Sequence, residues 1–127
     1  QMGTRFVCST ECIAHDNYKE RIIKAKDREA IVTGRSTGYP VRVLKNKFTR
    51  EYLELEKKGV SFEELEKLGA GRLRLAVMEG DMDNGSVMAG QISGLIKDIK
   101  TCEEIISNII EEAEENLNRL NKLKRGE

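Results

Sequence analysis

Apolar side chains recur every three or four residues over several stretches of this sequence, which is the spacing of one helix face. The first stretch runs from about Asp16 to Lys26, where apolar residues lie among charged ones. A second stretch begins at Asn46, a residue type that caps helix starts, and ends at Gly59, a typical helix terminator. The pattern therefore predicts two amphipathic helices in the first half of the chain.

Two further helices are predicted by capping boxes at residues 61–64 and 101–104. In this motif a hydroxyl oxygen accepts a hydrogen bond from one free backbone amide, and a glutamate reaches back to another. The first box predicts a short helix that runs to Leu68. The second predicts a long C-terminal helix to about Lys124, with an apolar face made of Cys102, Ile106, Ile109, Ala113, Leu117 and Leu120.

Strand signals are short and few. Residues 3–8 predict a short strand, and residues 30–34 have the β-branched character of another, closed by a glycine. The next stretch, 35–44, contains the single proline and is predicted to be an irregular loop with extended pieces. Residues 73–78 return to helical spacing before a turn at 79–86. Helix therefore dominates the predicted fold.

The composition narrows the class of protein. Lysine and arginine together number 22, as do aspartate and glutamate, so no overall charge favours DNA, RNA or an anionic membrane. No apolar run approaches the roughly 20 residues that a membrane-spanning helix needs. The 127 residues are enough for one domain, and the three cysteines fit reduced thiols better than a disulfide framework. We therefore expect a soluble, cytoplasmic protein.

Two short motifs resemble metal sites. Cys8, Cys12 and His15 could be joined by Cys102 in a tetrahedral zinc site, but their spacing lacks the tight CxxC of structural zinc sites, which favours ordinary thiols. Residues 81–85, DMDNG, resemble the start of a calcium loop, yet the twelfth position is an isoleucine where a bidentate glutamate is needed. We therefore expect a polar turn there and no metal.

His15 is the single histidine, so an acid–base role at neutral pH would fall to it. Its place just before a predicted helix favours capping or packing instead. A Cys–His nucleophilic pair is disfavoured, because the spacing places no Asn or Asp to orient the histidine.

Basic residues gather between positions 35 and 50, near three aromatic residues. They are Arg35, Arg42, Lys45, Lys47 and Arg50. A solvated surface would explain them, and so would a docking patch for a phosphate-bearing cofactor or an acidic protein.

Small residues mark two other places. Residues 86–96 are small and apolar, with Gly90 and Gly94 four apart, which fits either close helix packing or close approach to a ligand. At the chain start, Gly3 and Thr4 would offer amides and a hydroxyl to a phosphate if they ended a strand before a helix.

Nearly the whole chain resembles the C-terminal part of the FMN-dependent nitronate monooxygenase and enoyl-acyl-carrier-protein reductase II family. The matching pieces are QMGTRF at 1–6, AHDNYKERIIKA at 14–25, GYPVRVLKN at 38–46, LGAGRLRLAVMEGDMDNGSVMAGQISGLI at 68–96 and the helix that follows. The resemblance is closer to the reductase branch, through GSVMAGQ and RVLKNKFTRE.

The resemblance implies an α/β fold, the C-terminal part of an FMN-binding (β/α)8 TIM barrel with a helical excursion. Residues 1–29 would hold the last barrel strand, its phosphate-binding turn and the following helix. Residues 30–84 would form a mostly helical excursion over the barrel mouth, and residues 85–127 the return segment and C-terminal helix. The implied cofactor-binding residues are Gln1, Met2, Gly3, Thr4, Met88, Gly90 and Gln91, with Ala89 beside them.

The resemblance also implies an activity. NADPH or NADH would reduce FMN, and the flavin would reduce enoyl thioesters on acyl carrier protein during fatty-acid synthesis. The acidic carrier protein would give the basic stretch a partner. The family's catalytic histidine would precede Gln1, so no catalytic residue is assigned and His15 does not inherit that role. The alternatives are a nitronate monooxygenase, which uses FMN with oxygen, and a small helical interaction protein without enzymatic activity.

Much of such a barrel would precede Gln1. A strand at the chain start would then have an unpaired edge, so we expect a homo-oligomer, association with the missing half of the barrel, or partial disorder. The 127 residues alone are expected to be inactive.

Overall fold

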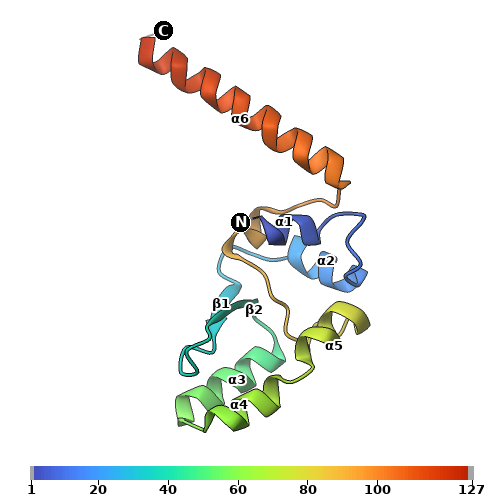
Figure 1. Cartoon of the computed structure of the whole chain (residues 1–127), viewed down its shortest axis with the longest axis vertical. Helices are drawn as coiled ribbons and strands as arrows, with labels where there is room; N and C mark the ends of the chain where they lie inside the picture. Colours follow the sequence, from blue (N-terminus) through green and yellow to red (C-terminus); the bar gives the residue numbers. More distant parts are fainter. Residues whose placement is uncertain (1, 126–127) are drawn as a thin grey trace.

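The computed structural model describes residues 2–125 and is predominantly helical (Figure 1). In chain order its elements are α1 (Gly3–Val7), α2 (Asp16–Ile23), β1 (Ala30–Thr33), β2 (Val41–Leu44), α3 (Lys47–Lys58), α4 (Phe62–Gly69), α5 (Arg72–Glu79), the 3-10 helix η1 (Gln91–Leu95) and α6 (Cys102–Arg125).

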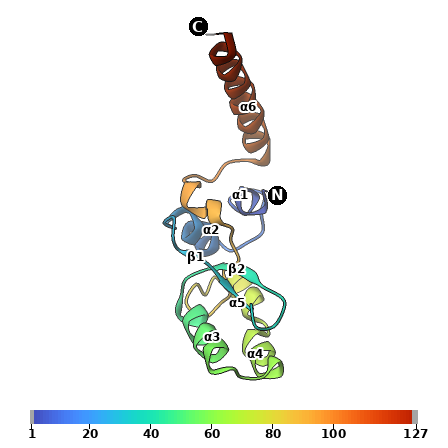
Figure 2. The same cartoon turned by 90° about the vertical axis from the view of Figure 1, so that its left-hand side faces the viewer.

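The elements fall into three parts along the long axis of the molecule. Helices α3, α4 and α5 lie at one end, beside the β1–β2 hairpin, and α1 and α2 lie in the middle (Figures 1 and 2). Helix α6 extends away at the other end. The short helix η1 contacts both α1 and α2, so the chain returns to its own beginning before α6 starts.

The strand predicted over residues 3–8 is wrong, because Gly3–Val7 form the helix α1. The amides of Arg5 and Phe6 both donate to the carbonyl oxygen of Met2, at 3.1 and 3.3 Å. Within the described residues the sheet has two strands, β1 and β2, and this segment is not paired with either. A strand needs a neighbour for its backbone groups, whereas a helix satisfies most of its own.

Strands β1 and β2 form an antiparallel hairpin in which Val32 lies opposite Arg42. The loop between them turns at Gly34, where φ is +77° and an added Cβ would lie 2.7 Å from the carbonyl oxygen of Tyr39. From the sequence, residues 30–34 have the character of a strand, and residues 35–44 are predicted to be an irregular loop with extended pieces. The structure pairs residues 30–33 with one of those pieces, residues 41–44, in a regular ladder.

Helices α3 and α4 begin where their caps predicted. The Asn46 side chain accepts a hydrogen bond from the Thr49 amide at 2.9 Å, and Gly59 ends α3 in the left-handed conformation. The Ser61 hydroxyl accepts from the Glu64 amide at 3.3 Å, while the Glu64 carboxylate accepts from the Ser61 amide at 3.2 Å. Both ends of α3 and the capping box of α4 are therefore confirmed.

The main core lies where α2, β2 and the segment after α5 meet. Ile22 of α2, Leu44 of β2 and Val87 are each fully buried. The remaining buried members of this cluster are Cys8, Ala14, Tyr18, Ala25, Ala76, Ala89 and Ile96. The core thus joins the first and last thirds of the chain.

Helix α6 also begins at its predicted capping box, where the Thr101 hydroxyl accepts from the Glu104 amide at 3.1 Å. Ile105, 1% exposed, anchors the first turn. Three residues of the predicted apolar face are left in solvent: Ile106, Leu117 and Leu120 are 53%, 61% and 56% exposed. The neighbouring Ile110 and Leu123, at 55% and 68%, are exposed as well. No helix within residues 2–125, α6 included, combines the length and apolar character that crossing a bilayer requires.

Candidate functional site

A pocket of about 480 Å³ lies between α1 and the segment that leads into η1. Its size is within the range of pockets that bind small molecules and cofactors. One wall comes from the chain start and the other from the segment before and into η1, with one residue of β2 beside them. The lining residues are Met2, Gly3, Thr4, Val7, Arg42, Met88, Ala89, Gly90, Gln91 and Ile92.

A hydrogen bond joins the two walls. The amide of Gly90 donates to the hydroxyl oxygen of Thr4 at 2.9 Å, across 86 positions of sequence. A Cβ on Gly90 would lie 3.4 Å from that hydroxyl, so the walls meet at close range. Because glycine has no side chain, the backbone stays accessible at this point.

Strand β2 of the hairpin fixes the second wall, residues 88–92, through backbone pairing. The Leu44 amide donates to the Val87 carbonyl at 2.9 Å, and the Ala89 amide donates to the Arg42 carbonyl at 3.2 Å. Met88 forms an isolated antiparallel bridge with Val43. Residues 87–89 therefore extend the sheet by a short pairing, which fixes the backbone that follows.

Tyr18 of α2 fixes the same wall from inside the core. Its hydroxyl donates to the Met88 carbonyl at 2.8 Å, and the side chain is 3% exposed. Burial raises the pKa of Tyr18 to about 12, because the phenolate would lose its hydration in the core.

Alkaline pH is expected to destabilise the fold through Tyr18. Its folded pKa of about 12 lies above the ordinary value of 10, so the stabilising effect is fully present below pH 10 and is lost as the pH rises toward 12. Tyr18→Phe cannot titrate, so its free energy of unfolding should fall less over this range. At pH 7 the same variant should lose about 1–2 kcal/mol, because the buried Met88 carbonyl loses its donor.

Urea unfolding of both proteins between pH 7 and pH 11.5 measures these effects. Tyr39→Phe is the matched control, because Tyr39 is 75% exposed and its hydroxyl donates no hydrogen bond within residues 2–125. An alkaline decline as steep in Tyr18→Phe as in the original chain would contradict the role given to the phenol.

The structure brings together six of the seven residues predicted to bind the cofactor. Met2, Gly3 and Thr4 form one wall of the pocket, and the other wall contains Met88, Gly90 and Gln91. The seventh, Gln1, lies outside the described residues. Cofactor binding by these residues stays a prediction, but their placement around one pocket is a property of this fold.

The sequence named Arg42 as one of five basic residues that could dock a phosphate-bearing cofactor or an acidic protein, and it did not name Val7, Ile92 or Tyr18 as site residues. Arg42 is partly buried and lines the pocket. Arg35, Lys45, Lys47 and Arg50 are exposed. Tyr18 carried no signal beyond helical spacing, because its hydrogen bond to residue 88 depends on the tertiary fold.

The cysteine and histidine cluster does not assemble into a metal site. Among residues 2–125 no three His, Cys, Asp or Glu side chains come together so as to hold an ion. His15 instead accepts a hydrogen bond from the Asn17 amide at 3.1 Å and caps α2, as its position predicted. Cys8 is fully buried, and burial raises the pKa of its thiol, which keeps it in the unreactive protonated form.

The predicted polar turn is confirmed at residues 81–85. The Asp81 carboxylate accepts from the amides of Asp83 and Asn84, at 3.1 and 2.9 Å. Hydrogen bonds from the Asn84 side chain and amide lower the pKa of Asp81. Its oxygens are thus used within the turn.

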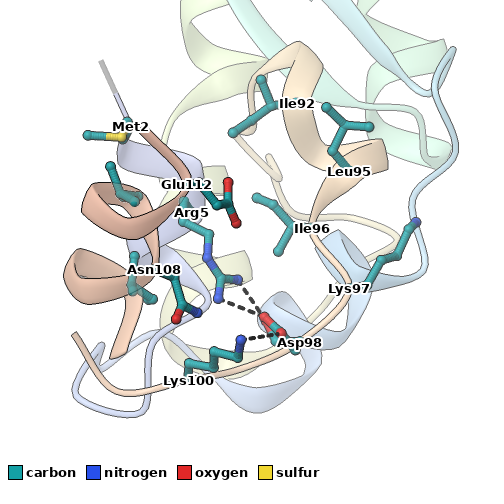
Figure 3. A pocket seen from close by; sticks show the side chains of 12 residues that line it. Met2, Arg5, Ile92, Leu95, Ile96, Lys97, Asp98, Lys100, Asn108 and Glu112 are labelled. Atoms are coloured by element: carbon teal, nitrogen blue, oxygen red, sulfur yellow. Dashed lines mark hydrogen bonds and ion pairs between the residues drawn. The ribbon is translucent and has the colours of Figure 1, made fainter. Parts of the chain in front are cut away.

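A second pocket, of about 400 Å³, lies between α1, η1 and the first turns of α6 (Figure 3). In it Arg5 donates to the Asp98 backbone carbonyl at 2.9 Å and to its carboxylate at 2.7 Å, and Lys100 lies 3.2 Å from the other carboxylate oxygen. Burial opposes ionisation of Asp98, but hydrogen bonds from Lys100 and Arg5 lower its pKa overall. These contacts tie α1 to the segment before α6.

A family model and a curated relative both carry the description nitronate monooxygenase. The family model matches residues 1–112. A probable nitronate monooxygenase of Staphylococcus saprophyticus is 28% identical over 119 residues, which cover 94% of this chain and 33% of that protein.

Two solved structures are also similar. The structure of FabK from Thermotoga maritima matches with a TM-score of 0.87 and 43% identity, over 93% of this chain and 37% of that one. A point mutant of the same FabK matches with a TM-score of 0.78 and 40% identity, over 93% and 35%. This chain spans about a third of the length of these relatives.

Proposed function

Because this chain belongs to the nitronate monooxygenase family, we propose that the protein that contains it is an FMN-dependent oxidoreductase. We further propose that the pocket between α1 and residues 88–92 is part of its flavin site. One observation carries this proposal: the two segments implied by the family resemblance line the same pocket and are joined by the hydrogen bond from Gly90 to Thr4.

The lining residues fit part of a flavin nucleotide. Gly3, Ala89 and Gly90 have small or absent side chains, which leave the backbone within reach of a flat ring or a phosphate. Thr4 and Gln91 offer polar groups, and Arg42 offers positive charge. The remaining lining, Met2, Val7, Met88 and Ile92, is apolar and would exclude water from one side of the ligand.

The finer proposal is reduction of enoyl thioesters, with NADPH or NADH as electron donor. FMN, when bound, supplies the hydride chemistry. The residues of this chain would bind and orient the cofactor and exclude water, and none of them is proposed as a catalytic acid or base. The similarity to FabK at 43% identity supports this reading. The alternative is nitronate oxidation, which the family model and the staphylococcal relative support by name.

Two partners are proposed on the same basis. Acyl carrier protein, which is acidic, would meet the exposed basic residues at the start of α3 and in the hairpin loop. The exposed apolar face of α6 would pack against the rest of the barrel or against a second copy. A 24-residue helix with this much apolar surface in solvent is otherwise a liability for aggregation.

Assays on the holoenzyme test the function. We expect a yellow protein that consumes NADPH or NADH with crotonyl thioester and shows little oxygen uptake with propyl nitronate. The reverse pattern would establish the monooxygenase. A colourless protein that gains neither activity with added FMN would contradict the proposal and favour the interaction-protein alternative.

A variant links the assay to this pocket. Thr4→Val removes the acceptor of the Gly90 amide with little change in volume, so the affinity for FMN should fall about tenfold. Thr10→Val is the control, because the Thr10 hydroxyl contacts Glu11, away from the pocket. Equal FMN dissociation constants for the two variants would place the flavin elsewhere.

A further inference from the structure

Arg42 is the one charged residue among the ten that line the flavin-site pocket. The others are apolar, glycine, threonine or glutamine. No acidic side chain shares the pocket, so within the described residues its charge is positive. A pocket of this kind attracts an anionic group on its ligand.

The hairpin register directs Arg42 to this pocket. Neighbouring side chains on a strand point to opposite faces, and Val41 lines a different, smaller pocket of about 160 Å³. Arg42 lines the flavin-site pocket, and its carbonyl accepts from the Ala89 amide at 3.2 Å. Its backbone is therefore fixed against the same segment that forms the second wall.

Most N–H donors of the Arg42 guanidinium have no hydrogen-bond acceptor within the described residues. The guanidinium carries five N–H groups, and within residues 2–125 its single hydrogen bond is a long one, 3.5 Å to the Ala30 carbonyl. Arg5 and Arg21, which are comparably placed between elements, each pair with a carboxylate at 2.7 Å. Removing the charge of an arginine from water costs free energy unless an anion pairs with it, and no carboxylate of the described residues pairs with Arg42.

We propose that Arg42 binds a phosphate group of a ligand in this pocket and thereby determines specificity for phosphorylated ligands. The inference rests on the proposed function for the choice of ligands. The phosphate could belong to FMN, to the nicotinamide nucleotide or to the thioester carrier, because all three carry phosphate esters. An arginine fork matches the oxygens of a phosphate in a bidentate manner.

The test compares each phosphorylated ligand with its unphosphorylated counterpart in the holoenzyme. The pairs are FMN and riboflavin, reduced nicotinamide mononucleotide and reduced nicotinamide riboside, and crotonyl-CoA and crotonyl-N-acetylcysteamine. Dissociation constants are measured for the flavins and KM values for the other pairs, in the original protein and in Arg42→Gln. Arg28→Gln is the matched control, because it removes the same charge from an exposed position that does not line the pocket.

We expect Arg42→Gln to weaken the phosphorylated member of one pair by about tenfold or more, with its counterpart changed less than about twofold. That pair identifies the source of the phosphate. Arg42→Lys should restore part of the affinity, and Arg28→Gln should change neither member. Equal weakening within every pair, or no weakening in any, would overturn the proposal.

A second measurement separates this inference from the proposed function. Inorganic pyrophosphate is titrated into this chain, and the backbone amide signals of Gly90 and Gln91, which line the same pocket, are followed by NMR. A shift that Arg42→Gln abolishes, in a protein that fails to bind FMN, would leave the phosphate site standing and reject the flavin function. Absence of any shift, in a protein that does bind FMN and shows no phosphate discrimination, would reject the phosphate site alone.

Discussion

Gly80→Ala is expected to lower the free energy of unfolding by about 2–3 kcal/mol, one of the two largest losses that we predict. Gly80 ends α5 with a φ of +70°, a conformation that costs an L-residue about 1–2 kcal/mol. An added Cβ would also lie 2.3 Å from Nδ1 of His15. That nitrogen caps α2, so moving the ring away sacrifices the cap, which contributes about another 1 kcal/mol.

Gly59→Ala separates the two causes. Gly59 ends α3 with the same φ of +70°, but nothing lies within 4 Å of its added Cβ. This control should therefore lose only the conformational part, about 1–2 kcal/mol. Urea unfolding at neutral pH measures both variants. If the two losses were equal, the contact between Gly80 and His15 would have no energetic weight.

The second large effect is expected at Asn46. Its side chain accepts from the Thr49 amide at 2.9 Å and donates to the carbonyls of Met82 and Gly85, at 2.8 and 2.7 Å. The residue is 8% exposed, so water cannot readily replace these partners. Asn46→Ala removes three hydrogen bonds and should cost about 3 kcal/mol or more in unfolding free energy.

A second substitution at Asn46 and a substitution at another helix cap separate the capping hydrogen bond of Asn46 from its two donations. Asn46→Asp keeps an acceptor for the helix cap but turns a carboxylate toward two carbonyl oxygens, so it should be nearly as destabilising as alanine. Ser61→Ala removes a cap from the exposed start of α4 and should cost about 1 kcal/mol. Thermal unfolding followed by circular dichroism measures all three. An aspartate variant as stable as the original chain would show that capping alone accounts for Asn46.

Asn46 also shows which contacts can be predicted from the sequence and which cannot. Its role as the cap of α3 was predictable, because the cap and the amide that it serves are three residues apart. Its two donations to the turn at residues 82–85 were not, since they span 36 and 39 positions. The same side chain thus combines one local and two tertiary functions.

The chain start shows the opposite case. Residues 3–8 were predicted as a strand, and they form a helix because their backbone groups find partners locally and no strand lies beside them within the described residues. The family assignment that accompanied that prediction is nevertheless confirmed. It depended on matching segments along the whole chain rather than on the conformation of one of them.

The sequence by itself determined helices α2 to α6, the caps at the starts of α3, α4 and α6, the polar turn and the family. These features depend on residues within four positions of each other or on the order of motifs, and both can be read along the chain. The tertiary structure decided the pocket, because Thr4 and Gly90 meet only after the chain returns to its beginning. It also decided the position of Arg42, since strand register determines which face of the hairpin a side chain occupies, and register is a property of the pairing between strands.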